Sequence, residues 1–179
     1  MQPKTKNCSI SSFGYTNIQL TALVTLRVLI GWHFLYEGIA KAMNPYWSSG
    51  RFLSESQWMF SRLFIAIADS PMALQVVDFL NIWGQILIGI ALISGCFSRL
   101  ASILGAILLL LYYLAAPPLV DLKYSMPNEG NYLVVNKTLI EASALFVLWL
   151  FPTGRIIGLD RLIFGQRRKG KQILSEPLE

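Results

Sequence analysis

Ionisable side chains recur at helical spacing inside a long apolar run that begins at residue 18. Arg27, His33, Glu37 and Lys41 fall within about one third of the circumference of a helix that turns about 100° per residue. An ionisable group inside a membrane span costs about 2.5–3.5 kcal/mol on insertion scales, so such groups are candidates for function. His33 and Glu37 are one turn apart and are candidate catalytic proton carriers. Arg27 and Lys41 are candidate ligands for an oxyanion or a carbonyl oxygen.

Two later apolar runs carry polar residues that should lie near the same membrane boundary. They are Asp78, Asn81 and Gln85 in one run, and Asn136, Lys137 and Glu141 in the other. At about 1.5 Å of rise per residue, most of these side chains lie roughly 6 to 12 Å inside the membrane. Arg27 lies near ~20 Å, from where its long side chain could reach outward toward Glu141. We assign Glu141 to the catalytic candidates and the other five residues to ligand binding.

These polar residues allow two interpretations. Three cations are matched in number by three carboxylates, and paired buried charges can simply fix how helices pack. The amides of Asn81, Gln85 and Asn136 exceed what that pairing needs. They favour a pocket for a polar or anionic head group, open to the outer face, over a purely structural network.

The elements that position these residues are expected to be membrane spans. Hydrophobic residues make up 54% of the 179 residues and charged residues only 14%, against about 25% in soluble domains. Four runs approach the ~20 apolar residues that a crossing needs, at about 18–40, 71–95, 99–116 and 132–151. Ser70, Pro71 and Gly95 are typical of the ends of the second helix. The sequence therefore predicts an all-α, polytopic membrane four-helix bundle.

Three further segments complete the predicted architecture. Residues 1–17 are a tail, 18–153 form the transmembrane domain, and 154–179 form a second, basic and amphipathic tail suited to an anionic membrane surface. The aromatic-rich run from Ser56 to Ala68 predicts a short helix lying in the membrane interface, in the first outer loop. Nine Lys and Arg residues flank the side that holds both termini, against four on the other side. This bias predicts that both termini are cytoplasmic.

Several kinds of chemistry lack the residues that they need. The two cysteines, Cys8 and Cys96, form no Cys-x-x-Cys pair, and His33 is the single histidine, so dithiol chemistry and a bis-histidine haem are excluded. We predict no metal site and no covalently bound cofactor. Although the net charge is +5, the basic residues are not interleaved with aromatic residues on a polar domain, so no nucleic-acid partner is expected. An electron-transfer role would need a diffusible quinone or a partner subunit.

A series of motifs extends over about residues 18–165. They are Arg27 to Lys41 with Gly31 and Gly38, Asp78 to Gly84, the turn Gly95 to Arg99, Leu111 to Pro118, Glu129 to Lys137, and Leu139 to Glu141. Together they resemble the DoxX family of integral membrane proteins, in its Bacteroidetes-type branch. The resemblance implies a four-helix inner-membrane bundle. It also implies a link to the DoxD-like subunit of thiosulfate:quinone oxidoreductase, in which a partner brings the electron donor.

Three functions follow as alternatives. In the first, the chain is a quinone-linked oxidoreductase subunit, in which cationic residues hold the ligand and His33, Glu37 and Glu141 pass protons. In the second, it binds a lipid, isoprenoid or other amphiphile without electron transfer. In the third, it is a structural subunit whose charges hold the helices together. The bilayer is the expected partner in all three, and a redox partner subunit and a homo-oligomer are possible additions.

Overall fold

The computed structural model describes residues 15–119, 122, 124 and 133–161, and within these residues the chain is helical and contains no strand. Six α-helices and a short 3-10 helix follow one another in the order α1 to α6 and η1. Their bounds are α1 Asn17–Met43, α2 Gly50–Ser54, α3 Ser61–Asp69, α4 Pro71–Ser94, α5 Ser98–Ala115, α6 Lys137–Leu150 and η1 Thr153–Arg155. The prediction of an all-α membrane protein is confirmed.

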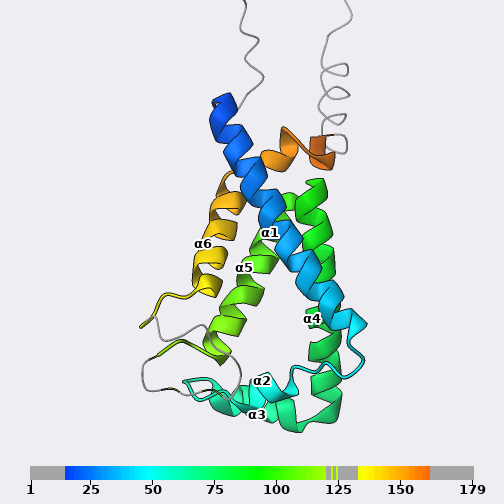
Figure 1. Cartoon of the computed structure of the whole chain (residues 1–179), viewed down its shortest axis with the longest axis vertical. Coiled ribbons are helices and arrows are strands. Elements are labelled where there is room, and N and C mark those ends of the chain that lie inside the picture. Colours follow the sequence, from blue (N-terminus) through cyan, green and yellow to red (C-terminus); the bar gives the residue numbers. More distant parts are fainter. Residues whose placement is uncertain (1–14, 120–121, 123, 125–132, 162–179) are drawn as a thin grey trace, which may run out of the picture.

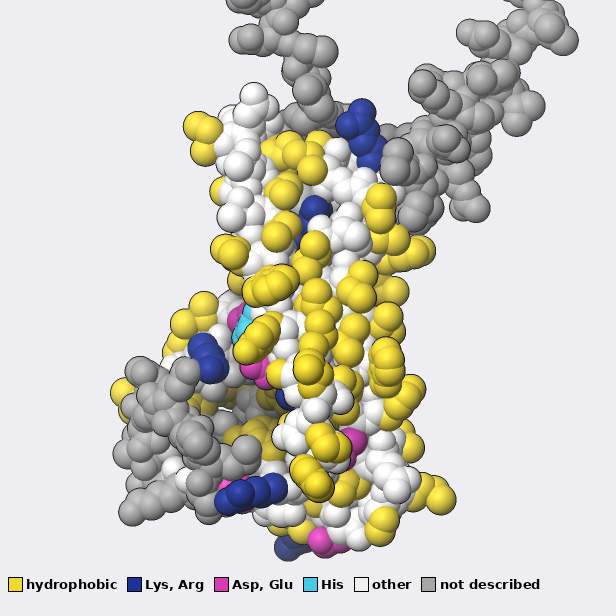
Figure 2. Space-filling model, turned by 45° about the vertical axis from the view of Figure 1, so that its right-hand side comes forward, with side chains coloured by type: hydrophobic (Ala, Val, Ile, Leu, Met, Phe, Trp, Pro, Cys, Tyr) yellow, Lys and Arg dark blue, Asp and Glu magenta, His cyan; other side chains and the backbone are white. Residues whose placement is uncertain are grey.

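Among the described residues, the helices α1, α4 and α5 are long and apolar enough to cross a membrane. They correspond to the first three predicted spans, with ends within three residues of those expected. Pro71 is the first residue of α4, and Gly95 ends that helix with φ 67°, a left-handed conformation that glycine adopts without strain. Side chains on the outside of the bundle are largely hydrophobic, as Figure 2 shows for one face.

The helix α6 is shorter than the predicted fourth span. It has 14 residues and begins at Lys137, because the side chain of Asn136 accepts a hydrogen bond from the Leu139 N–H and caps the helix there. Leu133 just before it has φ 62°, which is incompatible with a continuing helix. At about 1.5 Å per residue, α6 rises roughly 21 Å, less than the ~30 Å hydrocarbon core. That α6 crosses the membrane stays a prediction.

Two short helices, rather than one, lie between α1 and α4. Figure 1 shows α2 and α3 lying across one end of the bundle, which we call the α2–α3 end. The predicted helix over Ser56–Ala68 is wrong in its first part, because residues 55–60 form turns and α3 begins only at Ser61. Leu53 and Phe64 are buried against Ala115, so these helices pack onto the end of α5.

The main core joins all four long helices. Phe34 from α1, Leu92 from α4, Leu109 from α5 and Leu145 from α6 are buried in one cluster. Figure 1 shows α1 and α4 lying along one another, and α5 beside α6. At Gly89, the α4 backbone approaches α1 so closely that a Cβ atom there would lie 2.6 Å from the Leu35 backbone nitrogen. The small residue is what permits this contact between α1 and α4.

The opposite end of the bundle is closed by the residues that follow α6. Thr153 and Asp160 are 2% and 5% exposed, and the Asp160 backbone N–H donates to the Gly95 carbonyl across 3.0 Å. The predicted basic tail is described only as far as Arg161. The rest of it, like the first tail up to residue 14, lies outside the described residues.

Candidate functional site

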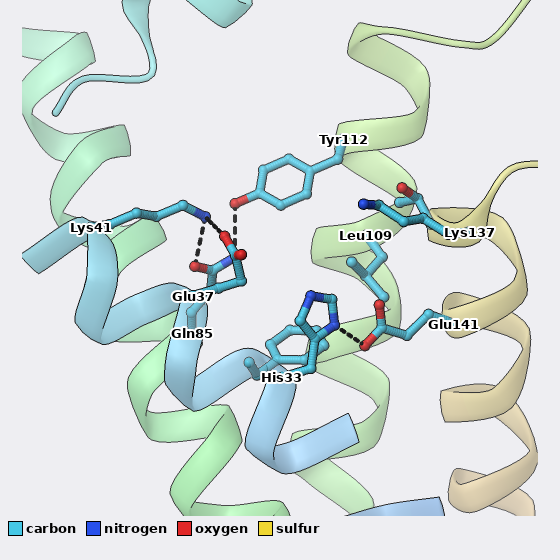
Figure 3. Close-up of a pocket in the computed structure, with 10 residues that line it drawn as sticks. His33, Glu37, Lys41, Gln85, Leu109, Tyr112, Lys137 and Glu141 are labelled. Atoms are coloured by element: carbon cyan, nitrogen blue, oxygen red, sulfur yellow. Dashed lines mark hydrogen bonds and ion pairs between the residues drawn. The ribbon is translucent and has the colours of Figure 1, made fainter. Parts of the chain in front are cut away.

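Polar side chains from all four long helices line a pocket of about 170 Å³ within the bundle. In Figure 3, α1 contributes His33, Glu37 and Lys41, α4 contributes Gln85, α5 contributes Leu109 and Tyr112, and α6 contributes Lys137 and Glu141. Phe34 and Thr138 complete its lining. Of the ten predicted site residues, six therefore meet at one place, which we call the polar pocket.

His33 and Glu141 connect two helices across the polar pocket. The His33 Nδ1 atom lies 2.8 Å from the Glu141 carboxylate oxygen Oε1, within hydrogen-bond distance (Figure 3). The histidine side chain is 47% exposed and the glutamate side chain 14% exposed, so one member of the pair is accessible and the other is largely enclosed. An imidazole hydrogen-bonded to a carboxylate can accept or donate a proton, which is the chemistry predicted for these two residues.

Lys41 is held in a fixed position at the rim of the polar pocket. Its ammonium donates to the Gln85 side-chain oxygen over 2.8 Å and lies 3.7 Å from the Glu37 carboxylate. It also sits 5.5 Å from the ring centres of both Trp47 and Tyr112, where an aromatic face attracts a cation. The side chain is only 15% exposed. A cation restrained in this way is suited to contacting a ligand oxygen without first losing conformational freedom.

Tyr112 was not among the predicted site residues, yet it organises the amides. Its hydroxyl donates to the Asn81 side-chain oxygen at 2.7 Å and accepts from the Gln85 side-chain nitrogen at 3.1 Å. Gln85 in turn accepts from Lys41, so a continuous chain of hydrogen bonds runs from Asn81 to Lys41. The signal in the sequence was that Tyr112 and Tyr113 are the polar side chains of a run that is otherwise apolar from Ile103 to Ala115.

A second and larger cavity of about 550 Å³ adjoins the polar pocket. Apolar side chains of α2 to α5 dominate its walls; they include Phe52, Leu53, Leu63, Phe64, Ile67, Val77, Leu108 and Leu111. Lys41, Tyr112, Lys137 and Thr138 line both cavities and so form the border between them. We call this second cavity the apolar chamber. Sequence reasoning missed it.

Three predicted ligand-binding residues have structural contacts outside the polar pocket. Asp78 accepts hydrogen bonds from the Ser48 hydroxyl at 2.8 Å and from the Ser49 backbone N–H at 2.9 Å, which tie the start of α2 to α4. Asn136 caps α6. Asn81 and Asn136 line the apolar chamber, together with other polar residues that include Ser48, Ser49 and Glu55.

Arg27 lies apart from the other predicted residues, and the expectation that it reaches Glu141 is not met. It is 3% exposed, and its guanidinium donates to the Thr153 hydroxyl at 3.0 Å and to the Ile157 carbonyl at 2.9 Å. Side chains on a helix lean toward its N-terminus, so Arg27 extends away from the polar pocket and toward the end opposite α2 and α3. On the face drawn in Figure 2, the acidic and histidine side chains all lie in the half nearer the α2–α3 end.

Metal coordination has no obvious site in the described part of the chain. There, no group of three or more His, Cys, Asp or Glu side chains lies close enough together to hold an ion. His33, Glu37 and Glu141 all line the polar pocket, but they do not form such a group.

Comparison with known proteins gives a single family. The family model described as DoxX matches residues 22–117, just over half of the chain. The matched region includes α1 to α5 and therefore most of the polar pocket, but it ends before Lys137 and Glu141 on α6. No curated protein and no solved structure matched the chain.

Proposed function

The chain belongs to the DoxX family, and on that premise we propose that it is a quinone-binding subunit of a membrane oxidoreductase. In this proposal the quinone head group occupies the polar pocket and a partner subunit supplies electrons. The bundle lies in a bacterial inner membrane with both termini in the cytoplasm, which requires α6 to complete a fourth crossing.

The observation that carries the proposal is the junction of a polar pocket with an apolar chamber. Ligand pockets are typically apolar cavities with a few convergent polar groups that fix orientation. A quinone combines an uncharged ring bearing two carbonyl oxygens with an apolar chain. The polar pocket offers donors to the oxygens, and the border at Lys41 and Tyr112 leads directly into apolar walls.

The lysine is the residue best placed to bind a carbonyl oxygen. An ammonium has three N–H donors, and the described partners Gln85 and Glu37 account for two of them. A hydrogen bond from a charged donor is about twice as strong as one between neutral groups. We therefore assign Lys41 the role of anchoring the head group.

Protons for the reaction would come from His33 and Glu37 on α1 and from Glu141 on α6. Reduction of one quinone to the quinol consumes two electrons and two protons, and the electrons come from the reductant that the partner subunit carries. The half-exposed His33 is joined to the enclosed Glu141 by a 2.8 Å contact. Glu37, beside Lys41, provides a second carboxylate at the pocket. These residues can hold and transfer protons next to the bound ring.

Replacing Lys41 by Met should release the quinone. Loss of a charged hydrogen bond of about 1.5–3 kcal/mol should lower quinone affinity by about tenfold to a hundredfold. The measurement is the quinone content, by mass spectrometry, of the full-length protein purified in mild detergent from quinone-containing bacterial membranes. Arg62→Met is the matched control, because Arg62 is exposed on α3 and lines neither cavity.

The expected result is quinone in the wild type and in Arg62→Met, and little in Lys41→Met, with all three equally folded by thermal unfolding. Equal quinone content in all three proteins would contradict the proposal. Quinone missing from the wild type, both as purified and after quinone is added back, would contradict it as well.

A second candidate function is binding of a lipid or isoprenoid without electron transfer. The observation that favours it is the size of the apolar chamber, which is about 550 Å³ against about 170 Å³ for the polar pocket. The same mass spectra distinguish the two functions. A stoichiometric phospholipid or isoprenoid, lost on chamber substitutions while quinone is absent, would favour this second candidate.

A further inference from the structure

The two cavities follow one another along the bundle axis in a fixed order on three helices. On α4, Gln85 lines the polar pocket while Asn81 and Val77 line the apolar chamber. On α5, Leu109 lines the pocket and Ala115 the chamber. On α6, Glu141 lines the pocket, and the residue preceding the helix lines the chamber. On α4 and α6 these chamber residues are one to two turns closer to the α2–α3 end, and on α5 the chamber extends from Leu108, beside Leu109, to Ala115.

This order places apolar walls toward the membrane surface and polar walls toward its interior. The chamber is roofed by α2 and α3, which lie across the end of the bundle (Figure 1). Val77 is eight residues, or about 12 Å, nearer that end than Gln85. A bilayer is arranged the other way, with polar head groups at the surface and ~30 Å of hydrocarbon between them. The protein interior therefore reverses the polarity of the lipid around it.

We propose that the bound amphiphile lies inverted relative to the bilayer lipids, with its polar ring toward the membrane interior and its apolar chain toward the α2–α3 end. This inference rests on the proposed function and deepens it, since it states how the quinone is oriented. The apolar chain of the quinone enters the apolar chamber past Lys41 and Tyr112, two of the residues that line both cavities.

The inversion also restricts the class of ligand. A phospholipid in the bilayer orientation would put its acyl tails among the charged side chains of the polar pocket. Apolar tails would leave those polar groups without hydrogen-bond partners, which is unfavourable. A compact, uncharged ring with hydrogen-bond acceptors and one apolar chain satisfies both cavities.

The experiment compares two probes, a benzoquinone without a chain and the same ring with a decyl chain, bound to the full-length protein in lipid nanodiscs. Val77→Phe fills the apolar chamber. Val76→Phe is its matched control, because Val76 is 54% exposed and lines neither cavity. His33→Phe changes a residue that lines the polar pocket alone. Leu111→Trp, at a half-exposed position of the chamber wall, serves as a second chamber variant should Val77→Phe misfold.

We expect the chamber variants to lower the affinity of the decyl probe by about tenfold and to leave that of the chainless probe within about twofold. His33→Phe should weaken both probes by the same factor, and Val76→Phe neither. Chamber variants that leave decyl binding unchanged, or that weaken both probes equally, would overturn the inverted orientation while quinone binding stands. Failure of the wild type to bind either probe would overturn the proposed function and the orientation with it.

Discussion

Replacing Asp160 by Ala should destabilise the protein more than any other single substitution considered, by about 3–5 kcal/mol. The carboxylate is 5% exposed and accepts three hydrogen bonds, from the Phe97 N–H at 2.7 Å, the Ser98 N–H at 3.2 Å and the Ser98 hydroxyl at 3.0 Å. It thereby caps the first turn of α5, because the Phe97 side chain at the N-cap position makes no capping hydrogen bond.

The same carboxylate stabilises a second buried charge. Arg27 is a buried cation near Asp160, and the direct hydrogen bonds of its guanidinium are with uncharged partners. Removing the acid would leave the guanidinium buried without a counter-charge and two backbone N–H groups of α5 without acceptors. Each of these losses is unfavourable by itself, which is why the expected effect is large.

The free energy of unfolding, measured for the purified protein in mixed micelles by denaturant titration, tests this expectation. Asp69→Ala is the matched control, since Asp69 is exposed at the end of α3. We expect the control to change the unfolding free energy by no more than about 0.5 kcal/mol. If the two variants were equally stable, the packing of the residues after α6 onto the bundle end would be incorrect.

Replacing Gly89 by Ala should have the second-largest effect, because it forces two backbones apart. A Cβ atom at Gly89 would lie 2.6 Å from the Leu35 nitrogen, and 2.8 Å from both the Leu35 Cα and the Gly31 oxygen. All three are backbone atoms of α1, so no side-chain rotation relieves the overlap. Overpacking of this kind typically costs about 1–3 kcal/mol, and occasionally more. The helix α1 also carries four residues of the polar pocket, so its displacement should weaken quinone binding too.

Gly84→Ala on the same helix is the control. A Cβ atom there would meet nothing within 4 Å. Alanine is favoured over glycine inside a helix by about 1 kcal/mol, so this variant should be as stable as the wild type or more so. Thermal unfolding of the two variants should therefore shift in opposite directions. A Gly89→Ala protein as stable as Gly84→Ala would contradict the close contact between α1 and α4.

Local signals in the sequence were sufficient to predict the long helices. Ser70 and Pro71 mark the start of α4, and Gly95 marks its end. These signals act over a few residues, which is why the ends of the first three spans were predicted within three residues. The start of the fourth helix was harder to foresee. The apolar residues just before Asn136 continue the hydrophobic run, but the cap at Asn136 excludes them from the helix.

Most residues of the polar pocket could be predicted from the sequence. Which of the predicted residues lie outside it could not. Helical spacing placed His33, Glu37 and Lys41 on one face, and it did not matter for that prediction how the helices pack. The direction of Arg27 depends on a partner 126 residues away, and the cap of α5 depends on Asp160, 63 residues from Phe97. Spacing within one helix contains no information on such partners.

The apolar chamber is the part of the account that only the packed structure provides. Most of its apolar side chains come from the four helices α2 to α5. The apolar residues of such a helix give no sign, in the sequence, of whether they face lipid or a cavity. Tyr112 illustrates the same point, since its hydroxyl acquires a role only when Asn81 and Gln85 of α4 meet it.

Photoaffinity labelling with an azidoquinone, followed by peptide mapping, tests the central claim most directly. The account predicts that the label attaches to the segments around Lys41, Tyr112 and Lys137, that excess decyl-quinone prevents this, and that Lys41→Met abolishes it. Labelling spread over the exposed faces of the helices, such as Phe79 and Trp83 on α4, and unaffected by competitor would contradict quinone binding in the polar pocket.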